Sequence, residues 1–154
     1  MKVIKWKRTI KRVNFGIQEL EVRTEKGVFD ELNDEFGFTL NPCCSKGINK
    51  CNRWFTGEEG LFQNWSNEIV YLYPPYKNIS VWLRKAYESS QNGATVVCLI
   101  PSRTETRWYH EYAMRGEIRL IKGRLKFEGY ENGSPFPSAI VIFRPPENID
   151  RLAA

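Results

Sequence analysis

The stretch 94-ATVVCLI-100, from Ala94 to Ile100, decides the fold class of this chain. It lacks the alternation of polar and apolar residues that marks a strand with one face in water, so we predict a strand buried on both faces. The stretches Ile69–Leu72 and 138-SAIVIF-143 have the same continuous apolar character. Strands of this kind are typical of mostly parallel sheets that helices cover on both sides.

Helical patterns lie between these predicted strands. Apolar residues recur at roughly helical spacing over residues 28–36, 81–90 and 104–113. Gly37 ends the first pattern, as glycine commonly does after a helix. The second can begin behind a capping side chain at Asn78 or Ser80. The alternation of strands and helices predicts an α/β domain with a mostly parallel central sheet and helices on both faces.

The other segments give weaker signals. We expect a short strand at residues 38–40, and residues 117–122 alternate like a strand that residues 123–127 continue at the sheet edge. Residues 43–67 are rich in Cys, Asn, Gly and Trp and are expected to form a loop. Residues 18–23 can form one more short strand.

The chain has 154 residues, of which 42% are hydrophobic and 27% are charged. This composition is typical of a folded globular domain and not of a disordered chain. No window approaches the roughly 18 apolar residues of a membrane helix, and no apolar segment follows the basic N-terminus to form a signal peptide. The four cysteines form no CxxC pair and there is one histidine, so we expect no metal site, and free thiols in a reducing cytoplasm.

Positive charge is concentrated at the N-terminus. Residues 1–23 carry seven Lys and Arg against two acidic residues, which accounts for the whole net charge of +5, and the remaining 131 residues carry 16 of each sign. We predict a basic arm over residues 1–21 and a single domain over residues 22–154. Such an arm suits contact with nucleic-acid phosphates, and a solvated tail would have the same composition.

A second basic region, between residues 103 and 127, mixes cations with aromatic side chains. This mixture suits a surface that follows phosphates and stacks on bases, and it equally suits a charged helix face above core aromatics. The cations are Arg103, Arg107, Arg115, Arg119, Lys122, Arg124 and Lys126. The candidate DNA contacts among them are Arg103, Arg107, Lys122, Arg124 and Lys126.

The predicted strand Ile69–Leu72 ends in Tyr73-Pro74-Pro75-Tyr76. Proline has no backbone N–H and a fixed φ, so the pair ends the strand. Ligands of parallel α/β sheets bind beyond the carboxyl ends of the strands, which directs attention to this turn and to the segments Asn41–Ser45 and Pro101–Arg103. A simple strand stop, or a ligand for a proline-binding domain, would also explain the pattern.

A polar residue followed by Pro-Pro-aromatic is also how amino-methyltransferases hold an exocyclic amine. A side-chain oxygen and the carbonyl of the first proline accept the two N–H groups, and the aromatic ring stacks on a base that has been flipped out of the duplex. Stacking of this kind is worth about 1–3 kcal/mol per base.

The chain resembles the phage-type Dam-like DNA adenine methyltransferases in the order and spacing of six stretches. These are RTEKGVFDELNDEFGFTLNPCCSKGINKC, WFTGEEGLFQNW, VYLYPPYKNISVWLRKA, VVCLIPSRTETRWYHEY, GEIRLIKGRLKF and PFPSAIVIFRP. The resemblance covers about residues 22–145 and implies a Rossmann-like, S-adenosylmethionine-dependent methyltransferase fold. It further implies methyl transfer to the N6 amine of adenine in double-stranded DNA, by a phage- or prophage-encoded protein in the cytoplasm of a bacterial host.

The resemblance assigns roles to individual residues. It places Thr24, Asn41, Pro42 and Cys43 near S-adenosylmethionine. The catalytic tetrad, which holds the target adenine, corresponds to Tyr73, Pro74, Pro75 and Tyr76. Gly123, Arg124 and Phe127 match a Gly-Arg-x-x-Phe segment near the target base or the DNA, and Ser102, Arg103, Trp108 and His110 match the loop and helix after the strand 94–100.

Three positions depart from the family pattern. Tyr73 stands where the family usually has Asn or Asp, Asn41 where it usually has Asp, and Glu25 where proline usually follows the threonine. Asn41 can keep a hydrogen bond to the cofactor but not the charge. The Tyr73 hydroxyl lies farther from the backbone than an Asn amide oxygen, so it cannot accept the adenine amine in the same geometry, whereas the Pro74 carbonyl still can.

Two hypotheses follow from these departures. One is an active adenine methyltransferase with an altered catalytic tetrad. The other is a catalytically impaired methyltransferase-like protein that binds DNA, S-adenosylmethionine or both. A nucleic-acid-binding module unrelated to methyl transfer is a third class, and it would leave the buried strand before Pro-Pro-Tyr without an explanation.

Overall fold

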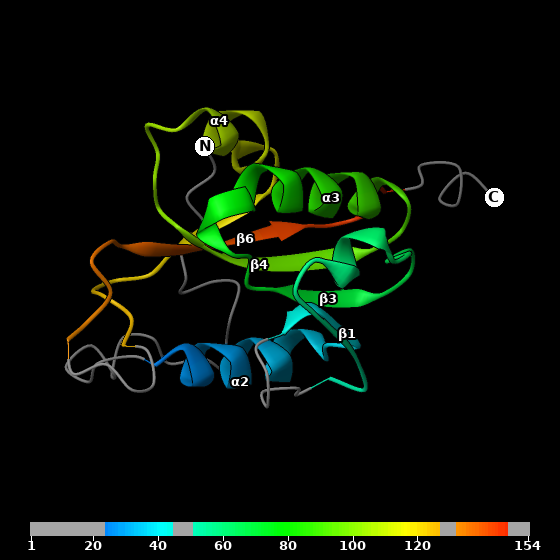
Figure 1. Cartoon of the computed structure of the whole chain (residues 1–154), viewed down its shortest axis with the longest axis horizontal. Helices are drawn as coiled ribbons and strands as arrows, with labels where there is room; N and C mark the ends of the chain where they lie inside the picture. The colour runs from blue at the N-terminus through cyan, green and yellow to red at the C-terminus, as the bar shows by residue number, and fades with distance from the viewer. Residues whose placement is uncertain (1–23, 45–50, 127–131, 148–154) are drawn as a thin grey trace.

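The computed structural model describes residues 24–44, 51–126 and 132–147, and the predicted arm and the predicted strand at 18–23 lie outside them (Figure 1). The described chain forms a six-stranded sheet in the order β2-β1-β3-β4-β6-β5. The strands are β1 (Leu40–Cys44), β2 (Arg53–Thr56), β3 (Ile69–Leu72), β4 (Thr95–Pro101), β5 (Glu117–Leu120) and β6 (Ser138–Phe143).

Five of the six strands run in the same direction. β1 is parallel to both β2 and β3, and β3 is parallel to β4. β6 is antiparallel to both β4 and β5, so β5 points the same way as β4. The predicted mostly parallel sheet is therefore confirmed.

Helices cover both faces of the sheet, as predicted. In Figure 1, α2 (Glu25–Phe36) lies below the sheet, and α3 (Ile79–Gln91) and α4 (Arg107–Glu111) lie above it. β4 contributes to both cores: Val97 and Leu99 pack in the core with α2, whereas Val96 and Cys98 pack in the core with α3. This two-sided burial is the reason that the sequence of β4 shows no polar alternation.

Local signals set the ends of the helices. The Thr24 side chain caps α2 by accepting a hydrogen bond from the Gly27 N–H at 3.0 Å. Gly37 ends α2 in the left-handed conformation, with φ of 68°, which confirms the predicted helix end. α3 begins directly after Asn78, but the Asn78 side chain makes no cap and instead donates to Glu58.

Two predictions for the first half of the chain are wrong in part. The short strand expected at residues 38–40 is instead β1, which continues through Pro42 because a shift of register against β2 accommodates the missing N–H. The loop expected over residues 43–67 contains β2 and a 3-10 helix, η1 (Glu59–Phe62). None of the four β2 residues is buried, so this edge strand lacks a strong apolar pattern.

Two predictions for the second half also need correction. The helix expected over residues 104–113 is shorter, because the chain stays extended at Thr106 and only α4 is regular, before a 3-10 turn at Ala113–Arg115. The strand expected to continue over residues 123–127 ends at Leu120 instead. Gly123 has a φ of 79°, and Lys126 forms a single bridge with Thr24, while Phe127 lies outside the described part.

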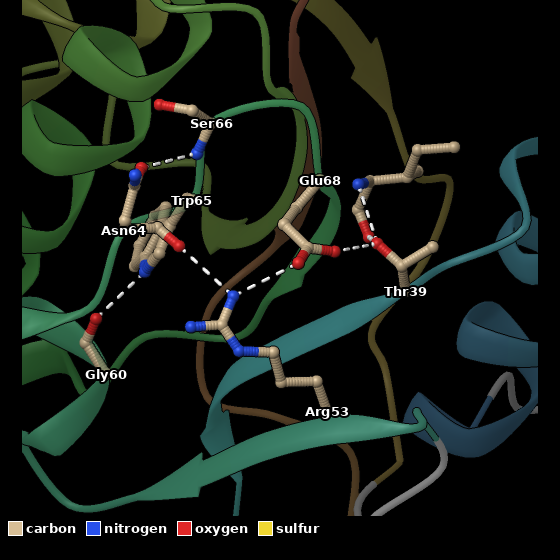
Figure 2. A network of polar contacts seen from close by, with 8 residues as sticks. Thr39, Arg53, Gly60, Asn64, Trp65, Ser66 and Glu68 are labelled. Carbon is tan, nitrogen blue, oxygen red and sulfur yellow. Dashed lines mark hydrogen bonds and ion pairs between the residues drawn. The ribbon is translucent and has the colours of Figure 1, made fainter.

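A polar network ties the edge strand to the sheet, as Figure 2 shows. Arg53, the first residue of β2, donates to Glu68 at 3.0 Å and to the Asn64 carbonyl at 3.2 Å. Glu68 in turn accepts from the Thr39 hydroxyl. Because these residues lie at the amino ends of β1, β2 and β3, the carboxyl ends stay available for a ligand site.

A buried ion cluster holds the far end of α2. The Arg119 side chain is 1% exposed and bonds both carboxylate oxygens of Glu35, at 2.7 and 2.8 Å, and Glu117 at 2.7 Å. Burial acts to raise the pKa of Glu117, but bonding to Arg119 and Arg144 outweighs it and leaves the pKa lowered. Arg119 is thus a structural residue, and the interpretation of residues 103–127 as an exposed basic surface is wrong for it.

None of the helices within the described residues is long and apolar enough to cross a membrane.

Candidate active site

The carboxyl ends of β1 and β3 flank a topological switch point in the sheet. The chain leaves β1 toward β2 on one side, and it leaves β3 through α3 toward β4 on the other side. Ligands of open parallel sheets bind at such points. The segment Asn41–Cys43 lies on β1 and the turn Tyr73–Tyr76 follows β3, so the fold places the predicted cofactor and catalytic segments side by side.

The β1 side of this site presents an unsatisfied buried acceptor. Asn41 is 7% exposed, and its Oδ1 has no hydrogen-bond partner among the described residues. Pro42 is buried, and Gly60 packs so closely that a Cβ there would lie 1.9 Å from the Pro42 carbonyl oxygen. Cys43 is partly exposed. A buried oxygen that lacks a donor fits a ligand such as S-adenosylmethionine, which carries several N–H and O–H groups.

The N-terminus of α2 meets the same edge. Thr24, which caps α2, pairs with Lys126 in an isolated β-bridge, and Lys126 lies in the loop after β5. The next residue, Glu25, accepts a hydrogen bond of 2.7 Å from the Tyr71 hydroxyl. Tyr71 is 2% exposed, and burial followed by the Glu25 charge raises its pKa well above the usual value. The fold therefore brings Thr24 to the switch point, although the sequence separates it from β3 by more than a helix.

The turn Tyr73–Tyr76 holds two tyrosines in contact. The hydroxyl oxygens of Tyr73 and Tyr76 are 3.2 Å apart, and their rings meet edge to face with centroids 6.4 Å apart. The pKa of Tyr73 is raised by burial, by the bond to Tyr76 and by nearby groups that include Glu25, so the hydroxyl stays protonated. The Tyr73 ring packs on the α2 side of the sheet. Pro74 is buried at the base of the turn, whereas Pro75 and Tyr76 are exposed.

A third ring in this site was missed by the sequence reasoning. Phe136, from the segment before β6, meets the Tyr76 ring edge to face with centroids 4.8 Å apart. The stretch PFPSAIVIFRP around it resembles the family, but no pattern in the sequence singles out Phe136 itself. Tyr76 is 42% exposed, so the pair forms an aromatic surface open to a flat ligand.

The candidate DNA contacts lie along the same edge of the sheet. Pairing of Pro101 with Ser138 and of Leu120 with Ala139 brings the ends of β4 and β5 and the start of β6 together there. This places Arg103, Lys122, Arg124 and Lys126 in the loops of that edge, with Arg107 on α4.

Surface ion pairs engage two of these arginines. Arg103 pairs with Glu105 and Arg107 with Glu111, and the two arginine side chains are 56% and 90% exposed. Exposed pairs of this kind contribute little to stability, so phosphates can replace the carboxylates at little cost. Arg124 donates to the Ser134 carbonyl at 3.4 Å, which links the loop after β5 to the segment that carries Phe136.

The cysteines near the site are free thiols. Burial and the neighbouring Cys44 raise the pKa of both Cys43 and Cys51 to about 11, so both thiols are protonated at neutral pH. The thiolate is the reactive form, so these side chains are weak nucleophiles. Within the described residues, no group of three His, Cys, Asp or Glu side chains could hold a metal ion.

A comparison with known protein families identifies the family of this chain. The family model of the Dam DNA N-6-adenine-methyltransferases matches residues 19–150. The chain belongs to this family. The resemblance predicted from the sequence is thus confirmed, and the Dam match includes β1, the Pro-Pro-Tyr turn and Phe136.

A relative of this Dam-family chain comes from a bacteriophage. A DNA N-6-adenine-methyltransferase of Escherichia phage T1 is 25% identical over 91 residues. The aligned region covers 57% of this chain and 38% of the phage protein, so the chain spans well under half the length of that relative.

Proposed function

We propose that this protein transfers a methyl group from S-adenosylmethionine to the N6 amine of adenine in double-stranded DNA. The observation that carries the proposal is the placement of Pro74-Pro75-Tyr76 beside Asn41 at the switch point, in a chain of the Dam family. The five co-directional strands and the helices on both faces support a Rossmann-like methyltransferase fold.

In this proposal the turn holds the target base. The Pro74 carbonyl accepts an N–H of the adenine amine and orients its lone pair. The rings of Tyr76 and Phe136 provide the surface on which the flipped base stacks. Tyr73 serves as a positioning residue, because its hydroxyl contacts that of Tyr76.

Thr24, Asn41, Pro42 and Cys43 are the residues proposed to hold the cofactor. S-adenosylmethionine supplies a methyl group already activated on a sulfonium, so the chain is not required to provide a nucleophile. The unsatisfied Asn41 Oδ1 is the described atom that best fits a bond to it.

DNA contact is proposed along the carboxyl edge of the sheet and the basic arm. Arg103, Arg107, Lys122, Arg124 and Lys126 would neutralise phosphates around the base pocket. The reaction would take place in the cytoplasm of a bacterial host, with the gene carried by a phage or prophage.

A second candidate is the catalytically impaired protein that binds its ligands without efficient transfer. One observation favours it: the turn offers no amide or carboxylate acceptor at position 73, and the hydroxyl present there contacts Tyr76. Membership of the Dam family favours the active enzyme.

Methyl transfer distinguishes the two candidates. The protein is incubated with tritiated S-adenosylmethionine and long unmethylated genomic DNA, which contains any short recognition sequence, and the DNA is hydrolysed to identify the labelled nucleoside. We expect label in N6-methyladenine and none with a duplex of only G·C pairs. Absence of label together with measurable DNA and cofactor binding would establish the impaired protein instead. Absence of both cofactor binding and DNA binding would reject both candidates.

A further inference from the structure

Two oxygen acceptors belong to the elements around Tyr71 at the switch point, namely Glu25 on α2 and Asn41 on the neighbouring strand β1. Leu40 pairs with Val70 across β1 and β3, and both point into the core under α3. Because side chains alternate along a strand, the next pair, Asn41 and Tyr71, faces α2. The Tyr71 hydroxyl reaches Glu25 on the first turn of α2.

The Asn41 side chain is an incomplete hydrogen-bonding partner. It is more than nine-tenths buried, and no described residue donates to its Oδ1. A buried acceptor without a donor is unfavourable, so such groups in native proteins usually mark the place of a missing partner.

Glu25 has the capacity for a further bond. A carboxylate offers about four acceptor positions, and the described contacts of Glu25 use one of them, for Tyr71. Its position in the first turn of α2 favours negative charge. Tyr71, which the carboxylate bonds, lies two residues before Tyr73, and both tyrosine rings pack on the α2 side of the sheet, next to the Tyr73–Tyr76 turn.

An amide oxygen and a carboxylate select a cationic group with several donors. Of the three parts of S-adenosylmethionine, the sulfonium has no N–H and the nucleoside is uncharged, whereas the amino-acid end carries an ammonium with three N–H donors. We infer that Glu25 and Asn41 bind the ammonium of the cofactor, with Tyr71 as the positioning residue that orients Glu25. The inference rests on the proposed function.

The test measures the binding of two ligands by titration calorimetry. S-adenosylhomocysteine carries the ammonium, and 5′-methylthioadenosine has the same nucleoside and thioether without the amino-acid end. Glu25→Gln keeps an oxygen to accept from Tyr71 and removes the charge. We expect it to weaken S-adenosylhomocysteine binding about tenfold or more, and to change 5′-methylthioadenosine binding by less than roughly twofold.

Asp34→Asn is the matched control, since it removes the same charge from an exposed position of the same helix and should change neither affinity. Glu25→Gln combined with Asn41→Asp returns a carboxylate to the site and should recover S-adenosylhomocysteine binding. If Glu25→Gln does not fold, Tyr71→Phe tests the same contact and should give a smaller loss for S-adenosylhomocysteine alone.

The outcomes separate this inference from the proposed function. Wild-type protein that binds neither ligand would overturn both. Wild-type binding with an unchanged Glu25→Gln variant, or with equal losses for the two ligands, would overturn the inference alone. No gain from the added Asn41→Asp change would exclude Asn41 from the ammonium site.

Discussion

The hydroxyl oxygens of Tyr73 and Tyr76 lie 3.2 Å apart across the Pro-Pro turn. The contact fixes the ring on which the target base is proposed to stack, and it occupies the hydroxyl at the position where an amine acceptor would otherwise stand. In the proposed reaction, Tyr73 therefore affects both the holding of the base and the rate of methyl transfer.

Tyr73→Asn is expected to raise methyl transfer. An amide oxygen at this position adds a second acceptor for the adenine amine, and one good hydrogen bond made in the transition state corresponds to about tenfold in rate. Single-turnover transfer with saturating cofactor measures the effect. Tyr73→Phe is the control, because it removes the hydroxyl without supplying an amide and should not gain. Equal rates for the two variants would show that position 73 does not limit the reaction.

Phe136→Ala is expected to lower the catalytic efficiency with duplex DNA. Loss of the ring that braces Tyr76 removes part of the stacking surface, which is worth about 1–3 kcal/mol per base, so kcat/KM for duplex DNA should fall about tenfold or more. Cofactor affinity should not change. Phe136→Tyr keeps the ring and should retain most of the activity, and a loss as large as that of the alanine variant would refute a stacking role.

Arg119→Ala is expected to destabilise the fold strongly. It leaves Glu35 and Glu117 without their buried partner, and breaking a buried pair in this way costs about 3–5 kcal/mol. Urea unfolding followed by circular dichroism measures the loss. Arg84→Ala, which breaks the exposed pair with Glu88, is the control and should shift the midpoint little. Similar midpoints for the two variants would contradict a structural role of the Arg119 cluster.

The lowered pKa of Glu117 predicts a dependence of stability on pH. A carboxyl whose pKa is lower in the folded state stabilises the fold fully above its unfolded pKa of about 4.3, and this stabilisation is lost as the pH falls through the folded pKa. Glu117→Gln should therefore be less stable than wild type at pH 7, and the difference should shrink on acidification. Urea midpoints between pH 7 and pH 3 give the comparison. A difference that does not change with pH would contradict the ion-pair origin.

Removal of residues 1–12 is expected to weaken DNA binding and its salt dependence. Six basic residues leave with this segment, and each phosphate contact contributes about 0.9 to the slope of log K against log salt. Anisotropy titrations from low to moderate salt measure the slope. A full-length variant with those six residues changed to Gln should behave like the truncation. An unchanged slope in both variants would show that the arm is a solvated tail that does not contact phosphates.

The sequence predicted the parts of the fold that depend on short-range pattern. The glycine after α2 and the proline pair after β3 restrict or permit particular backbone conformations at their own positions. The apolar run of β4 indicates a strand that is buried on both faces. Edge strand β2 was not predicted, because its residues are partly exposed and show no clear alternation of apolar and polar side chains. β1 was predicted to end at Leu40, whereas it begins there and continues to Cys44, because Pro42 is tolerated only through a register shift that depends on the neighbouring strand.

The candidate site also combines features that the sequence predicts with contacts that only the tertiary structure shows. The sequence by itself determined which segments are the candidates for the site, because Pro74-Pro75-Tyr76, Asn41 and the clustered basic residues are local features of composition and order. Only the tertiary structure decided that Tyr71 bonds Glu25, 46 residues away, and that Phe136 packs on Tyr76. Contacts between residues so far apart in the chain arise when strands pair and helices dock, and those steps depend on the packing of the whole core rather than on the residues in contact.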